Sequence, residues 1–317
     1  MSSSVTKARL QSIDNIIESI IDTSDNNFRE LAFHSLKMGG KRLRPTLYLL
    51  SLNFGEYYDK ELLYPAAALE LIHTASLYHD DVMDRAERRR DSISANAQWG
   101  NMNATYSGNY LFSKAISILS NYSINVNLIT CHYISELCLG QLKEAENAYN
   151  LHLSEEEHID IIKKKTASLF ELPCKLGVTL AGADKDTVEA LYKYSKNIGI
   201  AFQMIDDLLD LVGDPAKTGK KPGTDLKEGV YTYATLHALN SDNFSERLSD
   251  LLMIEDLNDS HILEAIEIIE NSGGMEIAKN KAEEHIQEAI NSLSFEPENA
   301  TKKSLINLAK FIIARDH

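Results

Sequence analysis

Segments with apolar residues at three- and four-residue spacing fill most of this chain, and few helix breakers interrupt them. Only 6 of the 317 residues are proline, and a proline inside a helix costs about 3 kcal/mol or more. Apolar residues recur at helical spacing from Leu10 to Ile21, and a stripe with the same period runs from Pro65 to Asp84. The sequence therefore predicts an all-α protein.

Further helices are predicted along the rest of the chain, with a polar, arginine-rich loop at residues 85–96. Ser154 to Glu157 match the capping-box pattern S-x-x-E, which marks the beginning of a helix. No repeat, low-complexity tract or linker divides the chain, so we expect one domain over residues 1–317. The remaining helices are expected at residues 103–120, 125–147, 186–211, 262–269, 275–293 and 303–314.

The charge of the chain limits the ligands that it can bind. The formal net charge is −15, which repels the phosphates of nucleic acids but leaves room for a small anion in a locally basic pocket. The three cysteines form no C-x-x-C pair. No run of about 20 apolar residues suits a membrane span, and residues 1–9 lack the apolar core of a signal peptide. These features favour a cytoplasmic protein.

Two segments share the pattern D-D-x-x-D, at Asp80–Asp84 and at Asp206–Asp210. On a helix, residues four apart share a face, so the outer two carboxylates of each motif point the same way. Such like charges repel by about 0.2–0.5 kcal/mol per pair. Carboxylate oxygens suit Mg²⁺, which takes one or two carboxylates together with phosphate oxygens from a substrate. Two such motifs on otherwise apolar helices favour a metal site over a solvated acidic helix end.

Basic residues stand close to the acidic motifs in the sequence. The segment GGKRLRP places Lys41 and Arg44 beside two glycines, which let a backbone approach an anion. Arginine binds phosphate through two nitrogens, and lysine acts as a point charge. Three arginines at 88–90 follow the first motif, and His73 lies two helical turns before Asp80. These residues predict a site for a phosphate group.

Four segments together resemble the all-trans polyprenyl diphosphate synthase family, a family of isoprenyl and farnesyl diphosphate synthase-like enzymes. They are GGKRLRP at 39–45, IHTASLYHDDVMD at 72–84, KTASLFELPCKLG at 165–177 and GIAFQMIDDLLDLVGDPAKTGK at 199–220. The resemblance implies a single bundle of mostly antiparallel helices around a deep central cavity, usually as a homodimer. It also implies a prenyltransferase that condenses isopentenyl diphosphate with an allylic diphosphate, with several Mg²⁺ ions in the site.

The resemblance assigns roles to particular residues of this chain. The implied Mg²⁺ ligands are Asp80, Asp81, Asp84, Asp206, Asp207 and Asp210. The residues implied for isopentenyl diphosphate are Lys41, Arg44, His73 and Arg90. Those implied for the allylic substrate are Arg89, Lys165, Thr166, Gln203 and Lys220. Catalysis would depend chiefly on Asp80, Asp84, Asp206, Lys165 and Lys220.

The product length depends in this family on the residues just before the first motif. Ala75 and Ser76 are small where short-chain members place a bulky aromatic residue, so we expect a long product of about C30–C50. The alternatives are a farnesyl or geranylgeranyl diphosphate synthase and a non-catalytic subunit of a heteromeric synthase. A class I terpene cyclase would need no Lys41 and Arg44 site, and a purely structural acidic protein would bind no diphosphate.

Overall fold

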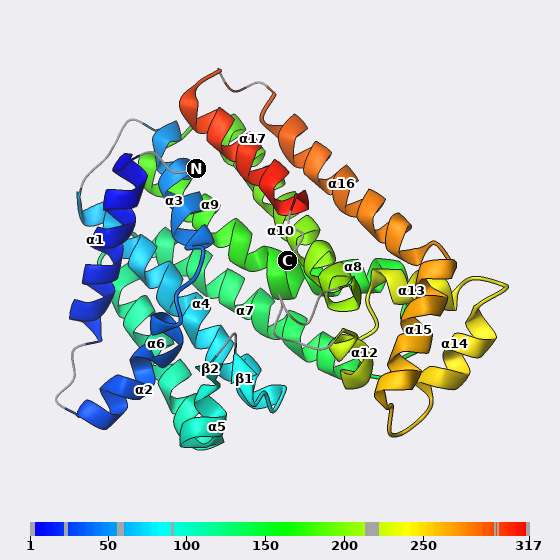
Figure 1. Ribbon diagram of the computed structural model, residues 1–317. Helices are drawn as coiled ribbons and strands as arrows, with labels where there is room; N and C mark the ends of the chain where they lie inside the picture. The colour runs from blue at the N-terminus through cyan, green and yellow to red at the C-terminus, as the bar shows by residue number, and fades with distance from the viewer. Residues whose placement is uncertain are drawn as a thin grey trace. The chain divides into compact units, whose positions relative to one another are not determined.

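The computed structural model describes residues 4–21, 25–55, 60–89, 92–212, 222–294, 296 and 298–314, and these are almost entirely helical (Figure 1). The expected all-α fold is confirmed. The chain divides into two compact units, which are described separately below. Unit 1 holds residues 1–132 and 172–189, and unit 2 holds residues 133–171 and 190–317. The expectation of one domain stays a prediction.

Unit 1 is built around the long helix α4, which carries the first aspartate motif. The elements of this unit are α1 (Ser4–Ile20), α2 (Asn26–Lys37), α3 (Leu43–Ser51), α4 (Leu63–Met83), β1 (Arg88–Arg89), β2 (Ser92–Ile93), α5 (Ala95–Trp99) and α6 (Asn101–Leu119). Helices α1, α3 and α6 pack against α4. Pro65 lies in the first turn of α4, where a missing backbone N–H breaks no helical hydrogen bond.

The segment after the first motif differs from the loop predicted over residues 85–96. Strands β1 and β2 pair in a minimal antiparallel hairpin, and α5 begins directly after it. The Ser94 side chain caps α5 by accepting a hydrogen bond from the backbone N–H of Ala97 at 3.3 Å. The His34 ring of α2 contacts the Ile93 carbonyl at 2.7 Å. The predicted loop is therefore wrong at residues 88–89, 92–93 and 95–96, where strand pairing, a helix cap and the contact from α2 give the backbone a regular form.

Unit 2 carries the second aspartate motif on α10. Helices α7 (Ile124–Glu146), α9 (Ser168–Ala181) and α10 (Lys185–Val212) contribute residues to both units. The further elements of unit 2 are α8 (Glu155–Ile162), a π-helical segment (Lys163–Ala167), α12 (Thr224–Glu228), α13 (Tyr233–Leu239), α14 (Ser245–Leu252), α15 (Asp259–Asn271), α16 (Gly274–Ser292) and α17 (Ala300–Ile313). The predicted helices at 103–120, 125–147, 186–211, 262–269, 275–293 and 303–314 are confirmed as α6, α7, α10, α15, α16 and α17.

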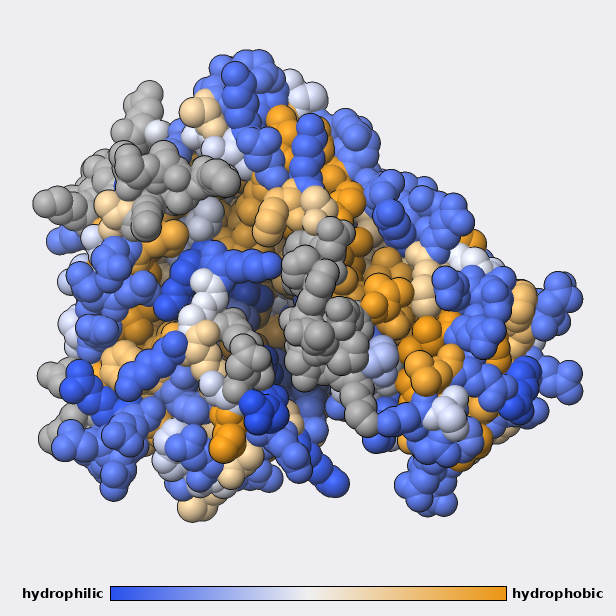
Figure 2. Space-filling model, viewed as in Figure 1, coloured by the Kyte–Doolittle hydropathy of each residue, from blue (hydrophilic) through white to orange (hydrophobic). Residues whose placement is uncertain are grey.

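The predicted capping box at the start of α8 is also confirmed. The Ser154 hydroxyl accepts a hydrogen bond from the N–H of Glu157, and the Glu157 carboxylate accepts one from the N–H of Ser154. On the face shown in Figure 2, hydrophilic side chains predominate and hydrophobic ones form smaller patches between them. Among the helices that the structure describes, none combines the length and the apolar character that a bilayer crossing requires.

Glu171 is a buried carboxyl group of unit 2, with 8% of the residue exposed. Burial raises its pKa to about 7, although a hydrogen bond with Tyr133 and the charge of Lys196 act in the opposite direction. The folded state therefore holds this proton more tightly than the unfolded chain does. The stabilisation that the Glu171 proton gives the folded state is therefore lost, and the free energy of unfolding falls, as the pH rises from about 4.5 towards 7.

A Glu171→Gln variant is expected to be more stable than the wild type at pH 8, by about 2–3 kcal/mol, because glutamine cannot ionise. The advantage should shrink steadily as the pH falls to about 5. Urea denaturation at several pH values measures it. Glu246→Gln, at an exposed position of α14, is the control and should change the free energy of unfolding by less than about 0.5 kcal/mol. A pH-independent difference between Glu171→Gln and wild type would contradict the prediction.

Candidate active site

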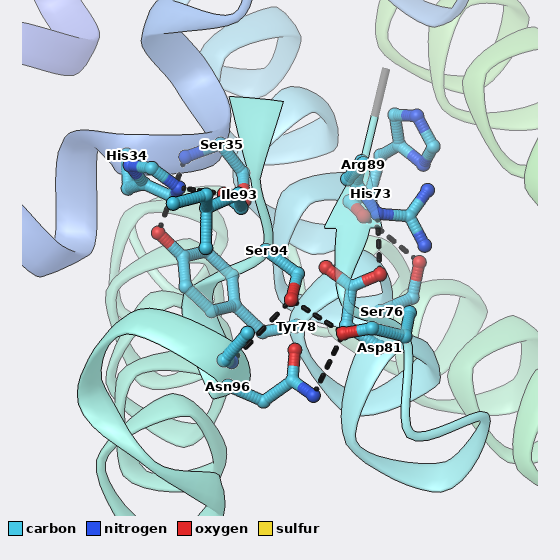
Figure 3. A network of polar contacts seen from close by, with 12 residues as sticks. His34, Ser35, His73, Ser76, Tyr78, Asp81, Arg89, Ile93, Ser94 and Asn96 are labelled. Atoms are coloured by element: carbon cyan, nitrogen blue, oxygen red, sulfur yellow. Dashed lines mark hydrogen bonds and ion pairs between the residues drawn. The ribbon is translucent and has the colours of Figure 1, made fainter. Parts of the chain in front are cut away.

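The first aspartate motif occupies the last turn of α4, and its three carboxylates differ in exposure. Asp80 is half-buried and Asp84, at the C-terminal end of the helix, is exposed. Asp81 is only 1% exposed, and its Oδ1 accepts a hydrogen bond from Nε of Arg89 at 2.7 Å (Figure 3). The outer two carboxylates are therefore less buried than Asp81, which orients Arg89.

The backbone after this motif is fixed by further polar contacts (Figure 3). The Ala86 carbonyl accepts hydrogen bonds from the Ser94 hydroxyl and, at 3.0 Å, from the Asn96 side chain. Within α4, the Ser76 hydroxyl donates to the carbonyl of His73 at 2.8 Å. The strand that carries Arg89 thus has a defined position relative to α4.

The basic turn lies between α2 and α3. Gly39 has a φ of +73°, a left-handed conformation that glycine adopts without strain. Lys41 is exposed, and Arg44 is half-buried in the first turn of α3. Because α3 packs against α4, Arg44 and His73 lie on neighbouring helices.

Arg42 connects this turn to the rest of unit 1. Its guanidinium forms an ion pair with Asp14 of α1 at 2.9 Å and a second one with the buried Glu70 of α4. The sequence predicts no role for Arg42 or Glu70. Nothing in their spacing shows that residues 28 positions apart meet.

The second aspartate motif repeats the pattern of exposure seen in the first. Asp206 and Asp210 are half-buried, and Asp207 is buried. Oδ1 of Asp207 accepts a hydrogen bond from Nε2 of Gln203 at 2.8 Å, and Oε1 of Gln203 accepts one from the Thr166 hydroxyl at 2.7 Å. The structure thus brings together three predicted site residues in one hydrogen-bonded chain.

Lys165 and Thr166 lie in the π-helical segment between α8 and α9, a local feature that occurs frequently at functional sites. The ammonium group of Lys165 forms an ion pair with Glu144 of α7. A side chain at Gly140 would overlap the backbone of Lys165, so glycine is required for this close approach of α7. Glu144 was not predicted from the sequence. Its ion pair fixes the position of the Lys165 ammonium group within unit 2, the unit that carries the second motif.

Asp225 is a further carboxylate next to the second motif that the sequence analysis missed. Its backbone N–H donates to Oδ2 of Asp210 at 3.0 Å. Burial, followed by the negative charges of Asp210 and Asp207, raises the pKa of Asp225 well above its usual range. Carboxylates this crowded need a cation or a proton to offset their repulsion, so the donor set fits a hard divalent metal.

The structure does not bring every predicted residue into one group. Arg90 and Lys220 lie outside the described residues. The other predicted residues fall into two sets, Lys41, Arg44, His73, Asp80, Asp81, Asp84 and Arg89 in unit 1, and Lys165, Thr166, Gln203, Asp206, Asp207 and Asp210 in unit 2. Within the part of the chain that the structure describes, no three acidic, histidine or cysteine side chains form a metal cluster by themselves.

Comparison with known proteins identifies the family. The family model of the polyprenyl synthetases matches residues 25–269. The chain is 34% identical over 284 residues to heptaprenyl diphosphate synthase component 2 of Bacillus subtilis, covering 89% of this chain and 81% of that protein. It is 32% identical over 289 residues to octaprenyl diphosphate synthase of Escherichia coli, covering 90% of each.

A solved structure of the same kind matches over nearly the full length. The polyprenyl synthase of Caulobacter crescentus, solved with calcium and isoprenyl diphosphate, superposes with a TM-score of 0.93 at 29% identity, covering 99% of this chain and 96% of that one. Other matches are named for short-chain and geranylgeranyl products. The chain belongs to the polyprenyl synthetase family, and it is a prenyltransferase of isoprenoid biosynthesis with the expected fold.

Proposed function

We propose that this chain condenses isopentenyl diphosphate with an allylic diphosphate in a Mg²⁺-dependent reaction that gives an all-trans polyprenyl diphosphate of about C30–C50. The observation that carries the proposal is the shared arrangement of the two D-D-x-x-D motifs. In each one, the outer carboxylates are half-buried or exposed, and the second carboxylate is buried and hydrogen-bonded to a predicted site residue. Carboxylates presented in this way suit Mg²⁺ that takes further ligands from a diphosphate.

The chain's own residues have distinct tasks in this reaction. Asp80, Asp84 and Asp206 would hold Mg²⁺, which neutralises the negative charge that grows on the leaving diphosphate. Arg89, oriented by Asp81, binds the allylic diphosphate as a preorganised cation. We assign four further residues to the allylic diphosphate, namely Lys165, Thr166, Gln203 and Lys220.

Isopentenyl diphosphate is assigned to the basic turn of unit 1, with Lys41, Arg44, His73 and Arg90. The allylic C–O bond breaks and its electron pair leaves with the diphosphate. The double bond of isopentenyl diphosphate then forms the new C–C bond, and the product loses a proton to the departing diphosphate. No protein nucleophile is needed, so the residues act by binding, orientation and charge.

The direct test is incubation of the purified protein with Mg²⁺, farnesyl diphosphate and labelled isopentenyl diphosphate, followed by sizing of the products. Products of about C30–C50 are expected. Products that stop at C20 would instead support a geranylgeranyl diphosphate synthase. A protein that elongates no allylic primer and binds no diphosphate with Mg²⁺ would refute the proposed activity.

A second candidate is a component of a heteromeric synthase. The Bacillus subtilis relative is named as component 2 of its enzyme, which favours this possibility. Both aspartate motifs are intact in this chain, so we assign it the catalytic role in any such assembly. Diphosphate binding without elongation by the protein alone would favour the heteromeric form.

We propose a homodimer as the working form in the cytoplasm. Apolar side chains lie exposed along one helix, α7, where Ile124, Leu128 and Leu142 are 70%, 61% and 60% exposed. Monomeric proteins rarely leave large apolar patches uncovered, and a second copy would cover this one. All three cysteines lie within the described residues and none forms a disulfide, which suits a reducing compartment. Sedimentation at micromolar concentration measures the oligomeric state.

The product length is expected to depend on Ser76. This residue is 6% exposed on α4 and lies one turn before Asp80. A Ser76→Phe variant should yield shorter products, because the aromatic ring fills space that the growing prenyl chain needs. Ser76→Ala is the control and should leave the product distribution unchanged. An unchanged distribution for Ser76→Phe, in a folded and active enzyme, would count against a role for this position.

A further inference from the structure

Asp207 is buried, and a different side chain lies close to each of its two carboxylate oxygens. Gln203 donates to Oδ1 at 2.8 Å. Oδ2 lies 3.5 Å from Nε2 of His158, a residue of α8 that is 6% exposed. Neither Oδ2 nor this Nε2 has a hydrogen-bond partner among the described residues. The His158 ring is therefore the polar group that covers the second oxygen.

The position of His158 is fixed by the structure around it. It follows directly on the capping box that begins α8, and the ring of His237 on α13 contacts Glu155 in the first turn of the same helix at 3.1 Å. A distance of 3.5 Å is longer than a good N–H···O bond, which spans 2.7–3.2 Å. A side-chain shift of a few tenths of an ångström therefore completes the bond. An imidazole that carries a proton on Nε2 can donate this bond.

A carboxylate buried this deeply needs partners for both oxygens, because an unpaired buried charge is strongly unfavourable. Holding Asp207 inward also sets the rotation of the last turns of α10. Since successive helical residues are separated by about 100°, Asp206 and Asp210 lie only about 40° apart around the helix, and both lie to the same side of Asp207. The orientation of the two outer carboxylates thus depends on what holds the middle one.

We propose that His158 is a positioning residue of the second aspartate motif. With Gln203, it holds Asp207 inside the protein, so that Asp206 and Asp210 present their carboxylates to the metal. Asp207 then acts through its internal contacts rather than as a metal ligand. This inference rests on the proposed function of the motif.

The test compares His158→Leu, which removes the donor, with His158→Gln, whose Nε2 amide lies at a similar reach and can donate to Asp207. His237→Leu is the matched control, because it removes a histidine that contacts a carboxylate of the same helix away from the motif. All variants carry Asp80→Ala, so that binding at the second motif dominates. The measurement is equilibrium binding of Mn²⁺ in the presence of inorganic diphosphate.

We expect His158→Leu to weaken Mn²⁺ binding by about 10-fold or more, the range typical of residues that orient a metal ligand. The Mn²⁺ affinity of His158→Gln should stay within about 3-fold of that of the Asp80→Ala parent, and the affinity of His237→Leu should equal that of the parent. Binding by folded His158→Leu that equals the parent would overturn the inference. So would equal weakening by His158→Gln and His158→Leu, since a merely structural role does not distinguish a donor from its absence.

A second measurement separates this inference from the proposed function. If the wild-type protein binds no Mn²⁺ with inorganic diphosphate, the proposed function fails. In that case, or if only the Asp80→Ala parent does not bind, the contact is tested by denaturant unfolding without metal. His158→Leu and Asp207→Asn should then show non-additive shifts in the unfolding midpoint, because the two side chains interact. Additive shifts would overturn the inference. If His158→Leu does not fold, His158→Asn replaces it, because its shorter amide cannot reach Asp207.

Discussion

Replacing Asp206 with alanine is expected to lower kcat/KM by about 10³-fold, which corresponds to roughly 4 kcal/mol of lost transition-state stabilisation. The carboxylate is accessible on α10, and we assign it to the metal that neutralises the leaving diphosphate. Its removal should not weaken the fold, because Asp206 and Asp210 are like charges at i,i+4 and repel each other by about 0.2–0.5 kcal/mol. Steady-state kinetics with both substrates measures the first effect, and urea denaturation measures the second.

Two further variants make the Asp206 result specific. Asp80→Ala, at the corresponding position of the first motif, should show a loss of similar size. Asp250→Ala removes an exposed aspartate from α14 and should leave the kinetics unchanged. Wild-type rates in both Asp206→Ala and Asp80→Ala would remove the metal assignment.

The features of the site that depend on local geometry were predictable from the sequence. The i,i+4 spacing of Asp80 and Asp84 places them on one side of a helix whatever the rest of the fold does. The capping box at Ser154 depends only on residues three apart, and it is present as predicted. The sequence is sufficient to predict features that depend on the helical period or on capping residues within one or two turns.

The internal contacts of the site could not be predicted in the same way. The spacing of Asp80, Asp81 and Asp84 shows that Asp81 points elsewhere, but not that Arg89 of a two-residue strand meets it. The Thr166–Gln203 bond joins residues 37 positions apart, and the contact of His158 with Asp207 joins two different helices. Such pairs form only when helices pack, and packing is decided by many apolar contacts that no short pattern describes.

The same limit explains the hairpin after the first motif. Residues 85–96 are polar and arginine-rich, and read alone they resemble a solvated loop. The contact of His34 with the Ile93 carbonyl comes from a helix 59 positions away in the sequence. Tertiary contacts override the local preference here, as they often do for short segments.

Replacing Arg42 with leucine is expected to lower the free energy of unfolding by about 3 kcal/mol. The change leaves Glu70, which is 6% exposed, without its cationic partner, and an unpaired buried charge costs about 3–5 kcal/mol. The contact with the more exposed Asp14 adds little, because exposed ion pairs contribute about 0–1 kcal/mol. Urea denaturation at pH 7 measures the change.

Two further variants test whether the unpaired charge of Glu70 causes this loss of stability. The double variant Arg42→Leu with Glu70→Gln should recover part of the lost stability, because the buried group is then neutral. Arg247→Leu breaks an ion pair with Glu264 in which both side chains are well exposed, so it should change stability by no more than about 1 kcal/mol. If Arg42→Leu were as mild as Arg247→Leu, the charge of Glu70 would not depend on Arg42, and the basic turn would be held to α4 by packing alone.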